Sequence, residues 1–305
     1  MGPQDILKGT IFSATTIIGL CGNTVALIFL LQVAHNEKKM MTNEVILCSL
    51  AVSNLTLLFT LGLPHSLFVF TVKYFHTDLD CQVDLYLLRV SRVMAIGLTC
   101  LLSCFQCTVL ASSSHSCWTA LKAWIQRYLG WIIIFLVLTS MASSINSALF
   151  PVISTNLTNL PYTFNLGYCF VIYPDKLSFE LIGFVAFARD AVLVILMALA
   201  SSYILFILFR HEKQMKGKRS SDRNQDKSAE RQAAKTLVTL VVLYVFFFGI
   251  DNVVWFYQIS KSNEINHFVT NLRLFVTFCF PSLFPFIIIF FNQKLRDKMT
   301  CSGNK

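Results

Sequence analysis

Long apolar runs alternate with shorter polar segments along the whole chain. A transmembrane helix needs about 20 mostly apolar residues, and seven runs reach that length. The seven runs are about Gly9–Gln32, Glu44–Val72, Val83–Leu110, Tyr128–Phe150, Phe179–Phe209, Lys235–Tyr257 and Phe268–Phe291. We therefore predict an all-α membrane protein in which a single domain, residues 1–305, forms a bundle of seven transmembrane helices.

The polar segments carry lysine and arginine unevenly. Seventeen of these residues lie on one side of the predicted bundle, four lie on the other side, and four lie inside the apolar runs. Cytoplasmic loops of membrane proteins carry an excess of positive charge. We therefore predict a multi-pass membrane protein with its N-terminus on the outer side, a cytoplasmic loop at residues 211–234 and a short cytoplasmic tail at residues 292–305.

The composition agrees with a membrane protein. Hydrophobic residues make up 55% of the chain and charged residues 13%, whereas soluble domains are about 25% charged. The net charge of +9 does not indicate a nucleic-acid partner, because nucleic-acid binding needs basic residues gathered on one folded face. Here the basic residues lie in loops, so we expect membrane lipid and no nucleic acid around the bundle.

The run Val83–Leu110 contains two arginines well inside its apolar length. At a rise of about 1.5 Å per residue, Arg89 lies roughly 9 Å and Arg92 roughly 13 Å from the start of the run. Residues three positions apart share one helix face. A guanidinium group inside a bilayer is costly unless it faces protein, water or a counter-charge. We therefore predict that this helix lies inside the bundle.

Later runs contain four more ionisable residues, Arg189, Asp190, Asp251 and Arg273. With the predicted orientation, all the membrane-embedded charges fall in the outer half or near the midplane. This distribution predicts a polar cavity that is open to the outside and closed below, as in a binding site and unlike a pore. Asp84 and Glu180 at the outer rim are candidates to neutralise the excess of arginine.

The same charges are also consistent with a buried ion-pair network that only fixes helix packing. Arg189 and Asp190 are adjacent on their helix, so we expect their side chains to point in different directions. His65, beside Pro64 in the second run, is expected to be a core histidine. The structural and the ligand-binding interpretations both stay open at this point.

Two of the ten cysteines, Cys81 and Cys169, fall in predicted outer segments. An oxidising exterior permits a disulfide between them, which ties the start of the third helix to the second outer loop. The other cysteines lie in helices or on the inner side, where we expect free thiols that pack like small hydrophobic groups. Asn156-Leu-Thr158, in the same outer loop, matches an N-glycosylation site.

Common catalytic motifs are missing from the sequence: it has no HExxH, no GxSxG and no Walker loop. Ser143, Ser144 and Asn146 in the fourth run indicate hydrogen bonding between helices. The paired broken helices and internal symmetry that are typical of transporters are missing too. We therefore predict no enzymatic activity, no cofactor and no metal, and we keep a small-molecule transporter as a less favoured alternative to a receptor.

Several stretches resemble one receptor family. The third run contains Arg89-Val-Ser-Arg92 and continues into Leu98-Thr-Cys-Leu-Leu-Ser-Cys-Phe-Gln106. Further stretches that agree are Leu50-Ala-Val-Ser-Asn54, Arg189-Asp190 leading to Ala198-Leu-Ala-Ser-Ser202, and Trp118 with Lys122. Together they closely resemble vomeronasal type 1 receptors, a pheromone-receptor family that includes related olfactory receptors of fish.

The resemblance covers nearly the whole chain and implies a rhodopsin-like G-protein-coupled receptor for small organic chemosignals, located in the plasma membrane with an extracellular N-terminus. The chain departs from the wider rhodopsin-like pattern in several places. It lacks Trp-x-Pro in the sixth helix, and Pro281 and Pro285 replace the usual Asn-Pro-x-x-Tyr. Thr108-Val-Leu-Ala-Ser112 replaces an acidic-Arg-Tyr motif, and Asn54 stands where an Asp usually helps to hold sodium. These departures suit the vomeronasal or the bitter-taste branch, so a bitter-taste-type receptor is the nearest alternative.

The resemblance also implies partners for the two sides of the bundle. We expect a heterotrimeric G protein of the inhibitory class on the inner side, and expression in sensory neurons. The candidate G-protein contacts are Trp118, Lys122, Arg210, Lys213 and Lys235. The candidate ligand-binding residues are Arg89, Arg92, Arg189, Asp190, Asp251 and Arg273. Because guanidinium groups pair well with carboxylates and other acceptors, we expect a small ligand that is anionic or bears a strong acceptor.

Overall fold

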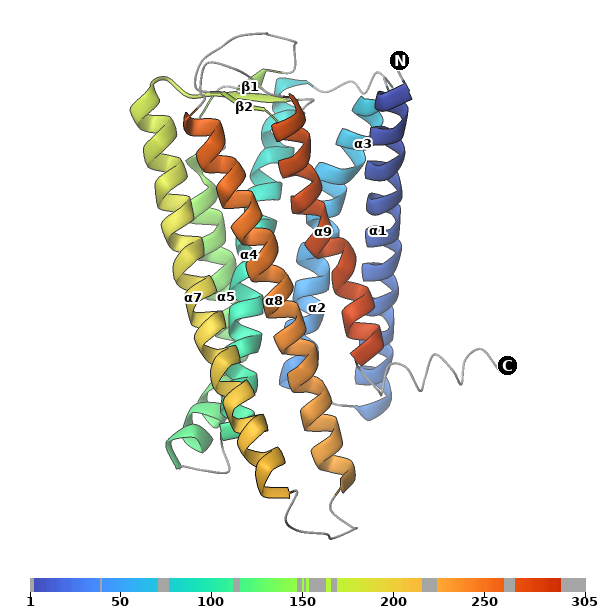
Figure 1. The fold of residues 1–305 in the computed structure, drawn as a ribbon, viewed down its shortest axis with the longest axis vertical. Helices are drawn as coiled ribbons and strands as arrows, with labels where there is room; N and C mark the ends of the chain where they lie inside the picture. The colour runs from blue at the N-terminus through green and yellow to red at the C-terminus, as the bar shows by residue number, and fades with distance from the viewer. Residues whose placement is uncertain are drawn as a thin grey trace, which may run out of the picture.

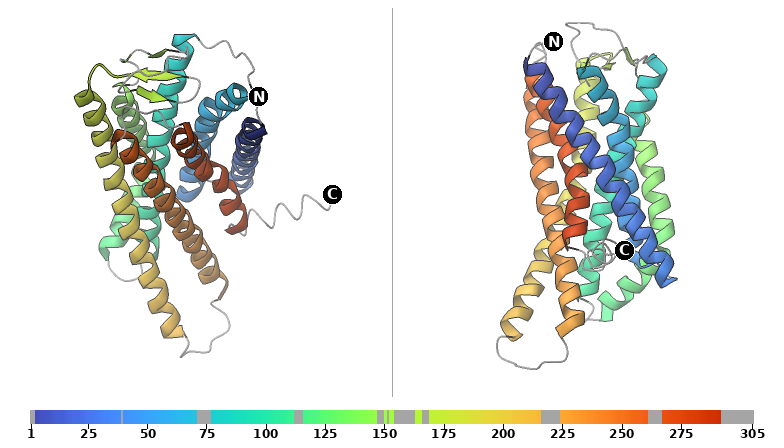
Figure 2. Two further views of the ribbon diagram at one scale, coloured as in Figure 1. Left: turned by 45° about the horizontal axis from the view of Figure 1, so that its top comes forward. Right: turned by 90° about the vertical axis from the view of Figure 1, so that its right-hand side faces the viewer.

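A computed structural model of the full chain shows an almost entirely helical protein whose helices stand side by side along one long axis (Figures 1 and 2). The structure describes residues 3–38, 40–70, 77–111, 116–146, 150, 152–153, 163–165, 169–215, 224–260 and 267–291.

The described residues form seven helical columns. The first is α1 (Pro3–Glu37), and the second consists of α2 (Thr42–Leu57), the π-helical turn η1 (Leu58–Gly62) and α3 (Leu63–Val69). The others are α4 (Asp78–Ala111), α5 (Ser116–Ser144), α7 (Lys176–Met215), α8 (Asn224–Ser260) and α9 (His267–Phe291). Within the described residues, six columns are long and apolar enough to cross a membrane, and α8 adds the shorter apolar stretch Val238–Val254. The predicted all-α fold class is confirmed.

A small antiparallel sheet covers one end of the bundle (Figure 1). Its strands are β1 (Val152–Ile153), β2 (Thr163–Asn165) and β3 (Phe170–Ile172), in the spatial order β1-β3-β2. Cys169, directly before β3, forms a disulfide with Cys81 near the start of α4, and their Cα atoms are 6.1 Å apart. We call this end, where α1 also begins, the disulfide end. Asn156, the predicted glycosylation site, lies outside the described residues.

The helix that carries Arg89 and Arg92, α4, occupies the centre of the bundle. Of its most apolar stretch 72% is buried inside the protein, compared with 17% for α5. Apolar residues of α4 belong to both buried clusters: Leu85 packs near the disulfide, whereas Ile96 and Leu98 pack deeper in the bundle. The prediction that this helix lies inside the bundle is confirmed.

Close packing joins α1 to the part of α9 that contains two prolines. A Cβ atom on Gly22 would lie 2.7 Å from Cγ of Pro285, so a glycine is needed for this approach. Pro285 has no N–H to donate to the Pro281 carbonyl one turn earlier. Asn23 donates its Nδ2 hydrogen to that carbonyl instead, at 2.8 Å. A side chain of α1 therefore replaces a hydrogen bond that Pro285 removes from α9, as the inside of a membrane requires.

The π-helical turn η1 precedes Pro64, which lies in the first turn of α3. Proline cannot donate to the carbonyl four residues earlier, and its ring collides with that carbonyl. Local widening to a π turn is one way in which a helix accommodates such a break. His65 is buried and packs edge-on against Phe12, with ring centroids 4.6 Å apart. The prediction of a core histidine is confirmed.

Several predicted helix ends differ from the structure. The predicted run 128–150 begins later than α5, which runs from Ser116 to Ser144, and residues 147–149 lie outside the described residues. The predicted loop 211–234 is too long, because α7 continues to Met215 and α8 begins at Asn224. Apolarity marks only the membrane-embedded part of a helix, whereas Lys, Arg, Glu, Gln and Ala also favour helix outside it. The predicted tail, residues 292–305, lies outside the described residues.

Replacing Cys81 or Cys169 with serine should sharply lower the amount of protein that reaches the cell surface. The disulfide joins residues 88 positions apart, and cross-links of this kind typically contribute about 2–4 kcal/mol to stability. Surface biotinylation measures the effect. Cys21→Ser, which removes an exposed free thiol, is the matched control. Normal surface levels for both variants would show that folding does not need the disulfide.

Gly22→Ala should lower the melting temperature of the detergent-purified protein, because the added methyl group meets the Pro285 ring. Overpacking of this kind typically costs about 1–3 kcal/mol. Gly130→Ala on α5 is the control, since nothing lies within 4 Å of its added Cβ and alanine favours helix by about 0.5–1 kcal/mol over glycine. The same melting-temperature shift in both variants would contradict the close contact between α1 and α9.

Candidate functional site

A cavity of about 460 Å³ lies between the helices near the disulfide end. Its walls come mainly from α4, α5, α7, α8 and α9, and Tyr173, just after β3, lines it as well. Small-molecule sites usually have volumes of about 300–1,000 Å³. The predicted ionisable residues all line this one cavity: Arg89, Arg92, Arg189, Asp190, Asp251 and Arg273. The fold therefore brings together charges that the sequence distributes over four helices.

The carboxylate of Asp251 on α8 is contacted from two other helices. Its Oδ2 atom accepts a hydrogen bond from a terminal guanidinium nitrogen of Arg92 on α4, at 2.6 Å. Its Oδ1 atom accepts from Nε of Arg273 on α9, at 3.1 Å. The residue is only 5% exposed. A buried charge is tolerated when it is paired and hydrogen-bonded, and here each carboxylate oxygen has its own arginine.

Arg189 and Asp190 contact each other although they are adjacent on α7. Nε of Arg189 donates to Oδ1 of Asp190 at 2.8 Å, and a terminal nitrogen donates to Oγ of Ser143 on α5 at 3.0 Å. The prediction that the two side chains diverge is wrong, because the long arginine side chain folds back to its neighbour. The second contact joins α7 to α5, so the predicted role of Ser143 in bonding between helices is confirmed.

Arg89 reaches the segment that follows β3. One of its terminal nitrogens donates to the hydroxyl group of Tyr173 at 2.8 Å. The Tyr173 ring is held between Phe150 and Phe179, with centroid distances of 5.1 and 5.3 Å. These contacts tie Arg89 to the disulfide-linked sheet. Glu180, a candidate to neutralise the arginines, has its carboxylate 3.5 Å from Lys176 of its own helix.

The cavity lining combines an excess of arginine with apolar walls. Four guanidinium groups and two carboxylates are its only formally charged side chains among the described residues. Leu61, Leu181, Phe179 and Phe187 are among the apolar side chains. Such a lining can hold a small molecule that has an apolar body and a hydrogen-bond acceptor or an anionic group. In the described part of the chain, no cluster of His, Cys, Asp or Glu is arranged to hold a metal ion.

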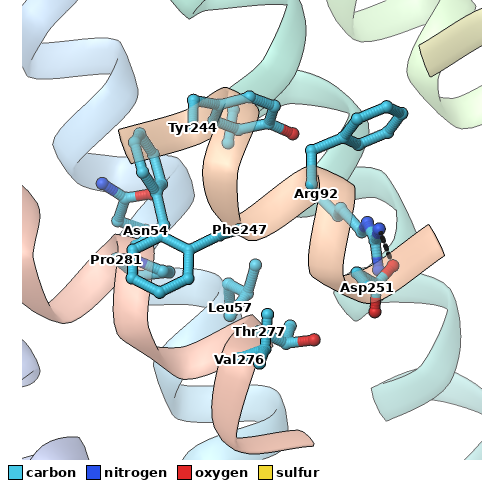
Figure 3. Close-up of a pocket in the computed structure, with 12 residues that line it drawn as sticks. Asn54, Leu57, Arg92, Tyr244, Phe247, Asp251, Val276, Thr277 and Pro281 are labelled. Atoms are coloured by element: carbon cyan, nitrogen blue, oxygen red, sulfur yellow. Dashed lines mark hydrogen bonds and ion pairs between the residues drawn. The ribbon is translucent and has the colours of Figure 1, made fainter. Parts of the chain in front are cut away.

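A smaller pocket of about 50 Å³ adjoins the Arg92–Asp251 pair (Figure 3). Arg92, Asp251 and Thr277 line both this pocket and the large cavity. Asn54 and Pro281 line the side away from the ion pair in the view of Figure 3. The ion pair therefore lies on the boundary between the two spaces.

The residues predicted to contact a G protein lie at the end of the bundle opposite the sheet, where α5 begins and α7 ends (Figure 1). Trp118 stacks on Tyr203 of α7, with ring centroids 5.8 Å apart and an interplanar angle of 25°. Lys122 is partly exposed and Arg210 is exposed. Lys213 and Lys235 fall within α7 and α8. Trp118 therefore has a packing role between α5 and α7 in this structure.

Sequence reasoning missed two tyrosines of the site. Tyr173 lines the large cavity and Tyr244 lines the small pocket. Tyr173 lies four residues after Cys169, so the predicted disulfide was a signal that this segment lies beside α4. Tyr244 lies seven residues before Asp251 on α8, and such a spacing places both on one helix face. A search limited to charged groups passes over both tyrosines.

Comparison with known proteins gives matches over almost the full length of the chain. The family model described as "Vomeronasal organ pheromone receptor family" matches residues 6–300. Olfactory receptor class A-like protein 1 of Danio rerio is 34% identical over 299 residues, which cover 98% of this chain and 93% of that protein.

Mammalian relatives have lower sequence identity to this chain but also match over more than nine tenths of it. Vomeronasal type-1 receptor 4 of Homo sapiens is 27% identical over 291 residues, which cover 95% of each chain. Vomeronasal type-1 receptor 92 of Rattus norvegicus is 26% identical over 287 residues, which cover 94% of this chain and 91% of that protein. The similarity therefore includes every helical column and both ends of the bundle.

Proposed function

This chain belongs to the vomeronasal organ pheromone receptor family, and from that premise we propose that it binds small organic chemosignals in the large cavity and activates a heterotrimeric G protein. As a member of the family it is a chemosensory G-protein-coupled receptor, a multi-pass protein of the plasma membrane and not an enzyme. The observation that carries the proposal is the cavity of about 460 Å³ that gathers all the predicted membrane-embedded ionisable residues.

In the proposed topology the disulfide end faces the outside of the cell. Disulfides persist in oxidising surroundings, and Cys81–Cys169 lies at this end. The opposite end carries the excess of lysine and arginine that favours the cytoplasm. The whole chain then forms one transmembrane unit with an extracellular N-terminus, a cytoplasmic connection between α7 and α8 and a cytoplasmic C-terminal segment. Glycosylation is proposed at Asn156.

In the proposed mechanism, a ligand in the cavity shifts an equilibrium between a resting and a signalling arrangement of the helices. A ligand can do so only if it binds the two arrangements with different affinities. A G protein of the inhibitory class then contacts the cytoplasmic ends of α5, α7 and α8. The proposed contacts are Trp118, Lys122, Arg210, Lys213 and Lys235. Family membership favours expression in sensory neurons.

The proposed ligand carries a strong acceptor or a negative charge. Arginine stays protonated and presents a planar fork that pairs with carboxylate, sulfate or phosphate. In a partly desolvated site, a charge-assisted contact contributes about 1.5–3 kcal/mol, or about one to two decades in affinity. An amine would place a cation beside the four arginines of the lining. Acids and neutral acceptors are therefore favoured over amines.

The alternative is that the arginines only hold the bundle together. Arg92, Arg189 and Arg273 each contact an aspartate, and removing one member of a buried pair typically costs about 3–5 kcal/mol. An experiment must therefore separate loss of folding from loss of ligand recognition. A carboxylic acid and its methyl ester do this, because they differ only at the group that an arginine would recognise.

Replacing Arg89, Arg92 or Arg273 singly with glutamine should weaken the response to a carboxylic acid agonist by about one to two decades. The response to its methyl ester should weaken less. Agonists are found by screening the expressed receptor against a chemically diverse odorant panel with a nucleotide-exchange readout. Their half-maximal concentrations are then compared for variants at matched surface levels.

Arg127→Gln is the control, since this arginine precedes Ala142, the first cavity-lining residue of α5, by about 22 Å along the helix. It lies over the ring of Tyr128. The substitution should leave the ratio of the acid and ester potencies unchanged. Equal losses of both potencies in the cavity variants would mean that the arginines hold the fold and do not recognise the ligand.

Signalling and transport are separated by reconstituting the purified receptor with a G protein in lipid vesicles. The agonist should accelerate nucleotide exchange on the G protein without accumulating inside the vesicles. Uptake of labelled agonist in the absence of nucleotide exchange would instead favour a small-molecule transporter. The same receptor in vesicles without G protein serves as the control for uptake.

A further inference from the structure

The two oxygens of the Asp251 carboxylate are occupied by arginines from different helices. Arg92 on α4 donates to Oδ2 at 2.6 Å, and Arg273 on α9 donates to Oδ1 at 3.1 Å. Asp251 itself belongs to α8, so one carboxylate joins three helices that are distant in sequence. All three side chains line the large cavity.

Two guanidinium groups that face one carboxylate form an anion-binding site. In this structure the anion that fills the site is the side chain of Asp251. Any external carboxylate that approached the same arginines would meet a position already taken. It would have to share the arginines with Asp251 or displace it.

We propose that Asp251 is a tethered competitor that occupies the anion site of Arg92 and Arg273 and so holds α4, α8 and α9 in the resting arrangement. The inference rests on the proposed receptor function and adds the way in which the same site is regulated. An anionic ligand that takes over the arginines releases Asp251 and with it the connection of α8 to α4 and α9. Binding and release are then linked, because the ligand binds more tightly where Asp251 has moved away.

The small pocket beside the ion pair gives these side chains room to rearrange. It measures about 50 Å³ and is lined by Arg92 and Asp251 themselves, with Asn54 and Tyr244 among its other residues (Figure 3). Packed protein interiors leave few voids larger than a water molecule. Here the pair has the ligand cavity on one side and this pocket on the other. In the proposed release, the side chain of Asp251 moves into one of these two spaces.

The restraint is tested without any ligand. Asp251→Asn keeps the shape of the side chain and removes its charge, so it weakens both charge-assisted contacts. It should raise the basal rate of nucleotide exchange by at least about tenfold, the shift expected from losing even one of them. Asp251→Glu, which keeps the carboxylate on a longer side chain, should raise the basal rate less than Asp251→Asn does. Glu180→Gln is the matched control, because it breaks a pair with Lys176 that lies within a single helix. A wild-type basal rate for Asp251→Asn would overturn the proposal.

Asp251→Asn leaves two half-buried arginines without their carboxylate and can fail to fold for that reason. The triple variant Arg92→Gln/Asp251→Asn/Arg273→Gln removes all three charges together and leaves none uncompensated. It should fold and show the same raised basal exchange. A folded triple variant with a wild-type basal rate would equally overturn the proposal.

The occupied anion site is tested with acetate as the probe. Asp251→Ala empties the position between the arginines, so added sodium acetate should raise the melting temperature of this variant clearly more than that of the wild type. If the variant is too unstable to purify, acetate during solubilisation should raise its yield. Acetamide, which has the same size and no charge, should do neither. An equal effect of acetate on wild type and variant would contradict the proposal.

These outcomes are distinguishable from a failure of the proposed function. Basal exchange and acetate stabilisation require no natural ligand, whereas the comparison of acid with ester depends on one. Raised basal exchange together with equal acid and ester losses would reject the anionic ligand and leave Asp251 as the restraint. No change in basal exchange together with a selective loss of acid potency would keep the ligand and reject the restraint.

Discussion

A charged side chain within a bilayer must find partners inside the protein, and the arrangement of this bundle depends on how Arg92 meets that requirement. The guanidinium group lies on α4, and its aspartate partner, Asp251, lies on α8. Arg273 of α9 contacts the same carboxylate. Because exposing any of these charges to lipid would cost several kcal/mol, α4 must be central and α8 and α9 must face it. The buried position of α4, in contrast to the exposed α5, follows from this constraint.

Backbone N–H and C=O groups inside a membrane also need partners within the protein. One such group, in α9, finds its partner on α1. Pro281 and Pro285 remove hydrogen-bond donors from α9, and Asn23 of α1 supplies one in their place. The absence of a Cβ at Gly22 lets α1 approach Pro285 closely enough for this bond. A helix interrupted in this way can be carried through a membrane only where a neighbouring helix restores the lost bond. Gly22 and Asn23 of α1 and the two prolines of α9 therefore belong to one interhelical contact.

Under the proposed function, the ionic contacts of the cavity serve both stability and ligand recognition. Breaking a buried pair costs about 3–5 kcal/mol, whereas a charge-assisted ligand contact contributes about 1.5–3 kcal/mol. A ligand that only broke these pairs would therefore bind poorly. A ligand that replaces one internal carboxylate with its own leaves the number of paired arginines unchanged, and the exchange is favourable only where the displaced aspartate finds water or another arginine of the lining. The excess of arginine over aspartate in the lining suits such an exchange.

Features that depend on local composition were determined by the sequence itself. The seven apolar runs, the two cysteines at one end and the six membrane-embedded charges were all visible in it, because hydrophobicity and spacing along one helix are local properties. Helix ends were less well predicted, since α5 and α8 continue as helix where apolarity stops. The pairing of Arg92 with Asp251 across 159 residues, the folding back of Arg189 onto Asp190 and the contact of Arg89 with Tyr173 were decided only by the tertiary structure. Each depends on how far a helix is rotated about its axis, and that rotation is fixed by the simultaneous packing of all its neighbours rather than by the residues of the helix alone.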